Sequence, residues 1–361
     1  MERVGVGVVG CGAIAQMMHL RYLKELGDRF RMVALADISP KLVDYVGDYY
    51  GVEQRFTDYR GLLDCPGVEA VVLLTNGTHT GMVIDSLRAG KHVLVEKPLC
   101  YSVAEADAVV EAASKSRNKV LLGYSVAFDP AFQHCLRLLK GWAGLDYVAA
   151  HVLHPADELY WSHQGVKRFD DAPPPVAGGV RAEVEGIITE SLGRGAAAAA
   201  RRAYYTLLES SIHDVYCLRL ALGGPAAVIS AETWNEGRDI AVTLRYPDGV
   251  RVQYAWVFNH ELKHFHQEYL FVGGANRMRI QWPSPFLRSA PTILWLDSMN
   301  GDALEERRVT SSYEESFKLE QMHFHDCITR GVAPLHTVEH ARDDTRLLEQ
   351  IAAAIAAGAS A

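Results

Sequence analysis

Residues 4–15 read VGVGVVGCGAIA, and this stretch decides the fold of the first part of the chain. The aliphatic residues in Arg3–Val9 predict a short β-strand, and the pattern of Ala13–Leu26 predicts a helix directly after it. The turn between them matches G-x-G-x-x-A. A strand, a glycine-rich turn and a helix in this order predict the first βα unit of a dinucleotide-binding domain.

Each small residue of this turn has a physical role. Gly10 permits the tight turn and Gly12 lets a pyrophosphate approach the backbone, while the N–H groups at the helix start, around Ala13 and Ile14, hold phosphates. Asp37 stands at the end of the second predicted strand. Its carboxylate can accept hydrogen bonds from the adenosine ribose and repel a 2′-phosphate, so we expect NAD as the cofactor, with NADP as an alternative.

Strands and helices alternate over the first third of the chain. Two helix starts are clear, because Ser39-Pro40 supplies an N-cap with proline at the first position and Ser102–Glu105 forms a capping box. This alternation predicts a doubly wound parallel sheet, the Rossmann fold, over residues 1–123. The further strands expected there are Arg31–Ala36, Ala70–Leu74, His92–Val95 and Lys119–Leu122.

Short strands separated by turn residues follow from Leu145 onward. Tyr246-Pro247-Asp248-Gly249-Val250 is a strong hairpin turn. Residues 124–361 are therefore predicted to form an α+β domain with a large, mostly antiparallel open sheet, which closes with a helix at His340–Ala357. The expected strands are Tyr147–Leu153, Ala227–Thr233, Ile240–Tyr246, Val250–Phe258, Glu268–Gly273, Met278–Trp282 and Ile293–Asp297.

The composition excludes several functions. A formal net charge of −8 disfavours nucleic-acid binding, which needs a basic surface. No apolar run reaches the roughly 18 residues that cross a bilayer, and the chain enters its first strand at once, so we expect neither a membrane partner nor a signal peptide. The scattered cysteines fit reduced thiols and a cytoplasmic protein.

His260-Glu261-Leu262-Lys263-His264 matches the metalloprotease pattern H-E-x-x-H. That chemistry needs a helix, so that both histidines lie on one face. Here the motif falls between two predicted strands, where a hairpin loop is expected. We therefore predict no metal site.

The segment Ala89–Leu99, which reads AGKHVLVEKPL, resembles the signature of the GFO/IDH/MocA (glucose-fructose oxidoreductase / inositol dehydrogenase) family. Thr75-Asn76 and His79 after the third core strand, Phe128–Phe132 at the predicted domain junction, and Gly331–Pro334 match the family in the same order. The resemblance is close over about the first 140 residues and loose beyond them.

The resemblance implies an NAD(P)-dependent oxidoreductase acting on a sugar, cyclitol or related polyol. It places Lys97 beside the nicotinamide as the group that exchanges a proton with the substrate oxygen, and it implies that the Lys97–Pro98 bond is cis. Hydride transfer at a secondary alcohol requires such a proton transfer, which a lysine amine can perform when its surroundings favour the neutral form. The cofactor contacts implied by the family pattern are Thr75, Asn76, His79, Glu96 and Lys97.

The second catalytic element of this family is a helix with an aspartate and, four residues later, a histidine. The counterpart here is Glu209 and His213, which one helix face presents a turn apart. His213 is predicted to share proton transfer with Lys97, and Glu209 to orient His213 or a substrate hydroxyl. Glutamate replaces the usual aspartate, and Tyr216 stands where a later acid is customary. Asp214 cannot replace that acid, because it points about 100° away from His213 around the helix.

Residues 154–195 are the part least like the family. A structureless loop of this length is uncommon in a compact domain unless it is functional or disordered. We interpret it as a lid or pocket wall that helps to choose the substrate, with an ordinary surface insertion as the alternative. Trp161, Tyr124 and Tyr216 are the candidate substrate contacts.

The leading prediction is NAD(P)-linked oxidation or reduction at a secondary alcohol or ketone of a carbohydrate-like molecule. Two alternatives stay open: a redox-assisted glycosidase or lyase that retains its NAD, and a dinucleotide-sensing regulator without catalysis. A large open sheet often pairs with its copy, so a homodimer or homotetramer through the C-terminal sheet is expected.

Overall fold

A computed structural model describes residues 3–142, 144–156 and 158–358. The chain forms two compact units, which we describe separately. Unit 1 comprises Met1–Tyr124, His163–Ile188 and Phe317–Thr345, and unit 2 comprises Ser125–Ser162, Thr189–Ser316 and Arg346–Ala361. The compact units therefore differ from the expected division at residue 123, because two later segments of the chain return to the first unit.

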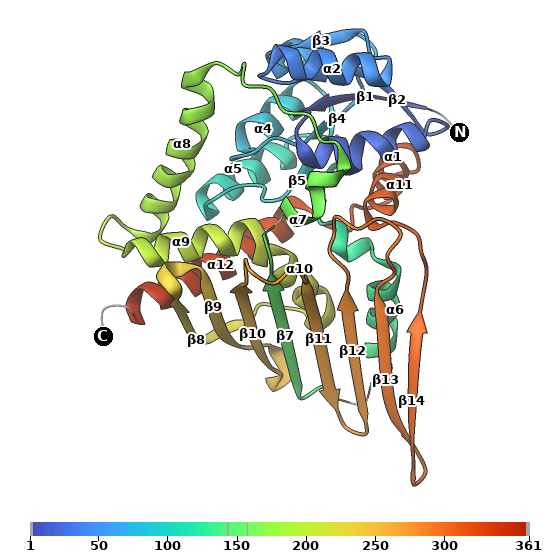
Figure 1. The fold of residues 1–361 in the computed structure, drawn as a ribbon, viewed down its shortest axis with the longest axis vertical. Coiled ribbons are helices and arrows are strands. Elements are labelled where there is room, and N and C mark those ends of the chain that lie inside the picture. Colours follow the sequence, from blue (N-terminus) through green and yellow to red (C-terminus); the bar gives the residue numbers. More distant parts are fainter. Residues whose placement is uncertain (1–2, 143, 157, 359–361) are drawn as a thin grey trace. The chain divides into compact units, whose positions relative to one another are not determined.

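Sheet A of unit 1 is the predicted parallel sheet (Figure 1). Its strand order is β3-β2-β1-β4-β5-β6, the order of a dinucleotide-binding Rossmann fold. All described pairings within it are parallel, as right-handed βα crossovers require. Its strands are β1 (Val4–Val9), β2 (Phe30–Ala36), β3 (Gln54–Phe56), β4 (Ala70–Leu73), β5 (His92–Glu96) and β6 (Val120–Gly123).

The central strands of sheet A are aliphatic on both faces, which is typical of a parallel sheet covered by helices. Every residue of β1, β4 and β6 is buried, which suits strands covered by helices on each side. The helices of this unit are η1 (Ala15–His19), α1 (Leu20–Glu25), α2 (Pro40–Tyr50), α3 (Tyr59–Leu63), α4 (Thr80–Arg88), α5 (Val103–Ser114) and α11 (Ser316–Thr329).

The predicted helix starts are confirmed. The Ser39 hydroxyl accepts from the Leu42 N–H at the start of α2, and Gly51 ends that helix with φ 71°. Ser102 accepts from the Glu105 N–H at the start of α5. In unit 2, the Asp129 carboxylate accepts from two backbone N–H groups at the start of α6 (Pro130–Leu139).

Unit 2 contains sheet B, with the strand order β14-β13-β12-β11-β7-β10-β9-β8. The sheet is mostly antiparallel as predicted, and the exception is the parallel pair β7–β10. The predicted hairpin turn joins β9 to β10, with positive φ at Asp248 and Gly249. The strands are β7 (Tyr147–His154), β8 (Ala227–Trp234), β9 (Asp239–Arg245), β10 (Arg251–Phe258), β11 (His266–Gly273), β12 (Asn276–Trp282), β13 (Ile293–Asn300) and β14 (Ala303–Thr310).

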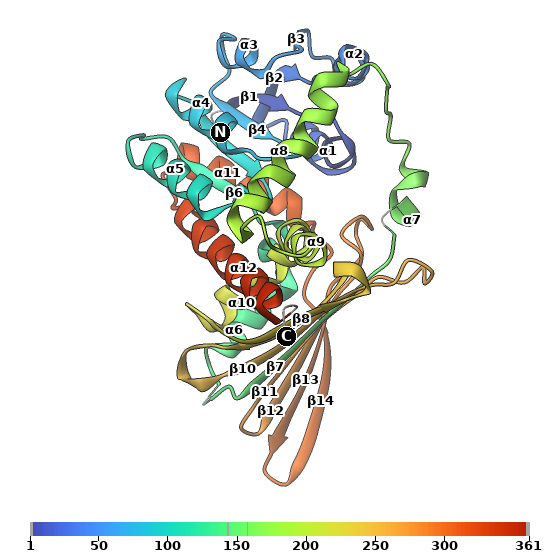
Figure 2. The same ribbon diagram turned by 90° about the vertical axis from the view of Figure 1, so that its left-hand side faces the viewer.

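The two faces of sheet B differ. In β10 the side chains of Val252, Tyr254 and Trp256 are buried, whereas Arg251 and Gln253 between them are exposed. The helices α6 and α10 (Ile212–Leu222) lie on the buried side, and Figure 2 shows the opposite face of the sheet without a covering helix among the described residues. This alternation is what a half-buried antiparallel sheet requires.

Residues 154–195 are largely helical, which corrects the expectation of a long loop. The segment contains α7 (Glu158–Trp161), η3 (Ser162–Gln164) and α8 (Pro174–Leu192). Helix α8 begins at Pro174, since proline is tolerated in the first turn of a helix. The sequence patterns also missed the short elements β3 and α3 and the edge strand β14, whose residues are mostly polar.

Several further expectations can be checked. The six cysteines are all free and buried. The H-E-x-x-H residues lie in the loop between β10 and β11, as predicted, so they lack the helix that zinc binding would need. Helix α12 (Val338–Gly358) matches the expected closing helix. Within the described chain, no helix has both the length and the apolar character to span a membrane.

Candidate functional site

The glycine turn after β1 has the geometry that the sequence predicts. Gly10 has φ +92°, and a Cβ there would lie 2.8 Å from the carbonyl carbon and oxygen of Leu74. A Cβ at Gly12 would meet nothing within 4 Å. The turn is therefore closed toward β4 and open at Gly12, so that a pyrophosphate has room against the backbone and the helix start at Ala13 and Ile14.

Asp37 lies beside this turn. Its Oδ2 accepts from the Cys11 N–H at 2.7 Å and its Oδ1 from the Ser39 N–H at 2.9 Å. Burial raises the pKa of Asp37, the two backbone hydrogen bonds lower it, and the charge of Asp171 raises it further. The carboxylate is thus fixed at the end of β2, where a Rossmann fold contacts the adenosine ribose.

The residues after β4 connect the glycine turn to Lys97. The His79 ring is buried, with Nδ1 2.7 Å from the Pro98 oxygen and Nε2 3.0 Å from the Thr75 oxygen. Its backbone N–H donates to the Leu99 oxygen at 3.1 Å. Thr75 is half-buried and Asn76 is exposed beside it. His79 therefore holds together the two loops at this edge of sheet A.

Lys97 follows β5 and is half-buried, whereas the residues on either side of it are buried. The Lys97–Pro98 bond is cis, as the resemblance implies. The Lys97 N–H donates to Glu96 Oε2 at 3.1 Å, and Glu96 Oε1 lies 2.7 Å from His19 Nε2. Glu96 is 6% exposed. Glu96 thus holds the Lys97 backbone, and its contact with the cofactor stays a prediction.

Sequence reasoning missed a buried cluster that holds Glu96. The Gln321 amide nitrogen lies 3.1 Å from the His19 carbonyl oxygen and 3.3 Å from His19 Nδ1. An amide nitrogen only donates, so Nδ1 accepts and Nε2 carries the hydrogen that bonds Glu96. Glu320, on the same helix as Gln321, is fully buried, and neither of its carboxyl oxygens has a hydrogen-bond partner in the described structure.

In unit 2, the predicted catalytic helix contains a π-turn. The segment α9 (Ala198–Thr206), η4 (Leu207–Ser211) and α10 is continuous, and Glu209 lies inside the π-turn. From residue 207 to residue 218, only Glu209, Ser210 and His213 are not buried. π-Turns are rare and often occur at functional sites. The helix thus presents to solvent the two side chains that the sequence singled out.

Tyr216 and Asp214 fix this helix from within. The Tyr216 hydroxyl is 2.8 Å from His213 Nδ1 and accepts from the Val126 N–H at 3.2 Å, so Tyr216 positions the imidazole. Asp214 is buried and accepts from three side chains of sheet B: Tyr254, Gln267 and Tyr269. Burial raises the pKa of Asp214 to about 6. As expected, Asp214 points away from His213 and anchors the helix to the sheet.

Two other candidates lie in packed surroundings. Tyr124 is 1% exposed, and its ring contacts His336 of unit 1 with centroids 4.9 Å apart. The Trp161 ring packs on Phe286 of unit 2 at 5.9 Å. Substrate contact by either residue remains a prediction.

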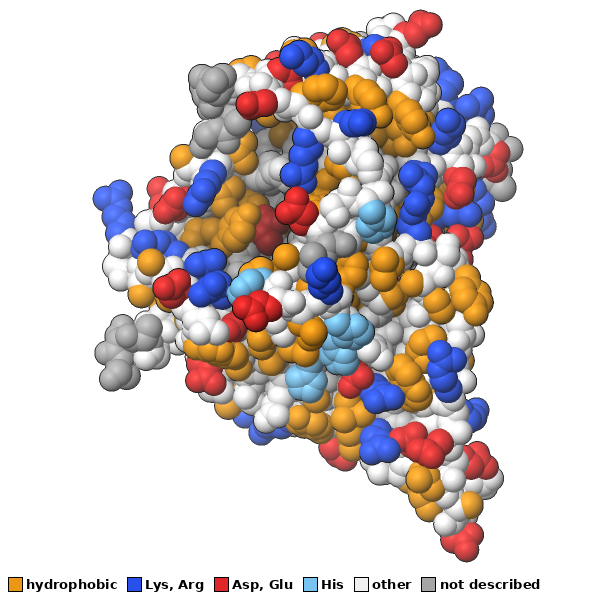
Figure 3. All heavy atoms as spheres, viewed as in Figure 1, with side chains coloured by type: hydrophobic (Ala, Val, Ile, Leu, Met, Phe, Trp, Pro, Cys, Tyr) orange, Lys and Arg blue, Asp and Glu red, His pale blue; other side chains and the backbone are white. Residues whose placement is uncertain are grey.

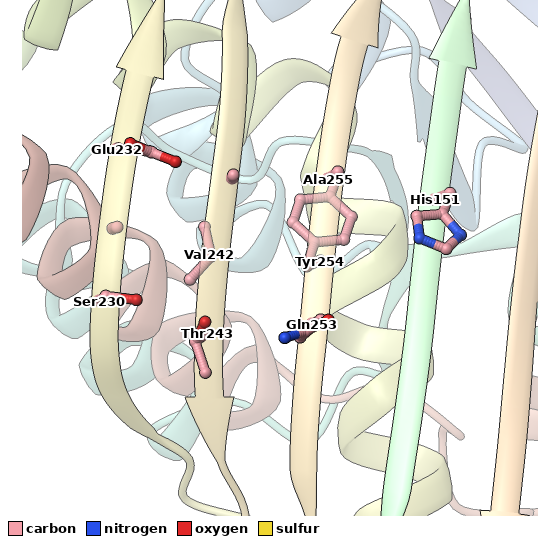
Figure 4. A pocket seen from close by; sticks show the side chains of 10 residues that line it. His151, Ser230, Glu232, Val242, Thr243, Gln253, Tyr254 and Ala255 are labelled. Atoms are coloured by element: carbon pink, nitrogen blue, oxygen red, sulfur yellow. The ribbon is translucent and has the colours of Figure 1, made fainter.

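A hollow of about 500 Å³ lies on the open face of sheet B (Figure 4). Its floor is formed where the small residues Ala241 and Ala255 pair across β9 and β10, and His151, Glu232 and Gln253 line it. None of the predicted site residues belongs to this lining. We therefore do not assign the substrate to it.

Comparison with known proteins agrees with this geometry. Residues 4–124 match the GFO_IDH_MocA model, which describes an oxidoreductase family with an NAD-binding Rossmann fold. The scyllo-inositol 2-dehydrogenase (NAD(+)) of Bacillus subtilis is 23% identical over 93% of this chain and 89% of its own. Residues 4–124 of this chain are therefore similar to the NAD-binding Rossmann domain of the GFO/IDH/MocA oxidoreductases.

Further proteins are similar to this chain over different lengths. The myo-inositol 2-dehydrogenase of Thermotoga maritima is 29% identical, but the match spans only 48% of this chain and 49% of that protein. The aldose-aldose oxidoreductase of Caulobacter crescentus has a TM-score of 0.75 at 18% identity, covering 99% of this chain and 98% of that one. At this identity the structural likeness establishes the fold alone.

The two glycines of the turn allow a matched test. We expect Gly10→Ala to lower the melting temperature, because its positive φ and the 2.8 Å approach to Leu74 leave no room for a Cβ. Gly12→Ala should keep the melting temperature while weakening NAD binding at least tenfold, since its Cβ would fill the open side of the turn. Thermal melts and calorimetric titration with NAD measure both. Equal behaviour of the two variants would contradict this assignment.

Glu320 predicts a pH dependence of stability. Burial and the charge of Glu96 raise the pKa of Glu320 well above its ordinary value, so the folded chain binds this proton more tightly than the unfolded chain. The resulting stability is present below the unfolded pKa and is lost as the pH rises toward the folded pKa. Glutamine does not titrate, so Glu320→Gln removes this loss. The unfolding free energy of the variant minus that of the unmodified chain should therefore increase by roughly 1 kcal/mol per pH unit above about pH 4.5.

Urea unfolding between pH 5 and pH 8 measures this difference. Glu53→Gln, at an exposed glutamate, is the matched control and should give a constant difference. If the difference in unfolding free energy between Glu320→Gln and the unmodified chain does not change with pH, the folded chain does not bind the Glu320 proton more tightly than the unfolded chain.

Proposed function

We propose that this chain transfers hydride between a nicotinamide dinucleotide and a secondary alcohol or ketone of a sugar, cyclitol or sugar derivative. When bound, the nicotinamide supplies or accepts the hydride. The inositol 2-dehydrogenases and the aldose-aldose oxidoreductase named above support this substrate class. The open turn at Gly12 and the fixed carboxylate of Asp37 support NAD as the dinucleotide, with NADP as the alternative.

The observation that carries the proposal is the setting of Lys97. Its backbone is held by the buried Glu96 carboxylate, and its side chain belongs to the one half-buried residue in an otherwise buried stretch from Val93 to Cys100. A lysine whose backbone is anchored next to a buried carboxylate is well placed for proton exchange with a substrate oxygen. Lys97 therefore takes the proton of the alcohol during oxidation and returns it during reduction.

His213 and Glu209 complete the proposed chemistry. The Tyr216 hydroxyl bonds His213 Nδ1 and so fixes the ring, and we assign Nε2 to the reacting oxygen. Glu209 lies inside the π-turn that precedes His213 and, like His213, is only half-buried; it orients the imidazole or a neighbouring substrate hydroxyl. Glutamate is one methylene longer than the aspartate usual in the family, and this difference favours a substrate unlike that of a typical member.

The central prediction concerns Lys97. Replacing it with methionine keeps the length of the side chain but removes the amine, so kcat should fall by about 10²–10⁴-fold while NAD affinity changes little. NADH formation against a panel of polyols, aldoses, amino sugars and inositols measures the rate, and calorimetry measures the affinity. Lys115→Met, at the exposed C-cap lysine of α5, is the control and should behave like the unmodified chain.

Full turnover in Lys97→Met would refute the proposed proton transfer. Tight NAD binding without turnover of any compound in the panel would instead support retained NAD in a redox-assisted cleavage, or sensing.

We also propose that the open face of sheet B joins copies of this chain into a homodimer or homotetramer. Figure 3 shows apolar and histidine side chains among charged ones over this sheet. Large apolar side chains are exposed on β8, β13 and β14, where Ile229, Met299 and Leu304 are 51%, 48% and 60% exposed. Exposed apolar side chains on an uncovered sheet face favour its contact with a second copy of the chain.

Ala255→Glu tests this assembly. Ala255 lies on the open face at the floor of the hollow, so a buried carboxylate there should break the contact between copies. Size-exclusion chromatography with light scattering should then give the monomer mass, whereas Lys140→Glu, at the C-cap of α6, should leave the assembly intact. A monomeric unmodified chain would disprove the proposal.

The free, buried cysteines support a reducing compartment, and we propose the cytoplasm as the location of the protein.

A further inference from the structure

Residues 166–171, which we call the strap, are bonded to the glycine turn of unit 1. The Lys167 N–H donates to Gln16 Oε1 at 2.9 Å, and Gln16 Nε2 donates to the Lys167 oxygen at 3.0 Å. The same Gln16 amide donates to the Cys11 oxygen at 2.8 Å. One side chain thus ties the strap to the backbone of the turn.

The other end of the strap reaches the start of α2. Asp171 Oδ2 accepts from the Lys41 N–H at 2.9 Å, and Oδ1 accepts from the Ser39 hydroxyl. Beside it, the rings of Phe169 and Tyr45 are 6.2 Å apart. The strap therefore runs from the glycine turn to the residues after β2.

These two anchor points are the ends of the adenosine half of a Rossmann dinucleotide site. The pyrophosphate is held at the glycine turn, and the ribose hydroxyls are contacted at the end of the second strand. The strap follows the line between them. It belongs to the segment that the sequence analysis interpreted as a substrate lid, yet all its contacts described above are with the cofactor edge of sheet A.

Asp171 accepts hydrogen bonds from groups of a kind that commonly bind phosphate in proteins. A free backbone N–H in the first turn of a helix, a serine hydroxyl and a nearby lysine together form a typical anion site. The hydrogen bond from Ser39 and the charge of Lys41 lower the pKa of Asp171, so the carboxylate is ionised at neutral pH. The Asp37 carboxylate also contacts Ser39, because its Oδ1 accepts a hydrogen bond from the Ser39 N–H.

We propose that Asp171 occupies the place of the adenosine 2′-phosphate and, together with Asp37, selects NAD over NADP. This inference rests on the proposed dinucleotide-linked function. Asp37 accepts from the ribose hydroxyls, while Asp171 fills the anion site that a 2′-phosphate would need and repels its charge. The strap is thereby a part of the cofactor site, and Asp171 is a specificity-determining residue contributed from 132 positions away from Ser39.

A purely structural role makes a different prediction. If Asp171 only caps α2, its loss should lower the melting temperature and weaken both dinucleotides together. A specificity role changes the ratio of the two affinities instead.

The test is calorimetric titration of the full chain with NAD and with NADP. We expect Asp171→Ala to bind NADP about tenfold more tightly than the unmodified chain, because Ser39 and Lys41 become available to the 2′-phosphate. NAD affinity should stay within about twofold. Asp171→Asn, which keeps the shape of the side chain without its charge, should show the same direction with a smaller change.

Asp170→Asn is the matched control, because this neighbouring aspartate is exposed and should not alter either affinity. An unchanged NADP affinity in both Asp171 variants, with normal NAD binding, would overturn this inference and leave the proposed function standing. An equal loss of both affinities would also overturn it in favour of a structural cap. Failure of the unmodified chain to bind either dinucleotide would overturn the proposed function and this inference together.

Discussion

The bond between His19 and Glu96 is the interaction on which the cofactor edge of unit 1 depends. His19 ends the π-turn that follows the glycine turn, and Glu96 ends β5. Their 2.7 Å contact, buried on both sides, therefore fixes the first helix relative to the residue whose carboxylate holds the Lys97 backbone. Gln321 of α11 restricts the ring from the other side. Three elements distant in sequence thus meet at one imidazole.

Two helices carry a π-turn near residues that the sequence singles out. In η1 the wider turn separates the glycine turn from His19, and in η4 it contains Glu209 and precedes His213. A π-turn inserts one residue into the helical repeat, so side chains beyond it are rotated around the axis relative to a regular helix. The i, i+4 pairing that the sequence suggests for Glu209 and His213 is therefore altered by the helix itself. Spacing alone cannot reveal this change, because it depends on which backbone hydrogen bonds form.

The local features of this chain were predictable, whereas its long-range contacts were not. The strand, turn and helix at residues 4–15, the N-cap at Ser39 and the position of Asp37 follow from periodicity and capping chemistry. By contrast, Glu320 reads as an ordinary helix glutamate, and only the fold buries it. Asp171 reads as half of a solvated Asp-Asp pair, although it caps a helix 130 residues earlier. The edge strand β14 was missed because six of its eight residues are exposed and its pattern has no apolar face.

Unit 1 is assembled from three separate stretches of the chain, and this limits how the protein can be modified by recombination. A fragment that ends at residue 123 keeps all six strands of sheet A but lacks α11, and with it the amide that orients His19. It also lacks residues 166–171, which Gln16 ties to the backbone of the glycine turn. Domain exchange at a single junction would therefore transplant an incomplete module in which the position of Lys97 is less well supported. Viable chimaeras, and by the same reasoning viable evolutionary exchanges of cofactor preference, need to carry the returning segments along with the strands.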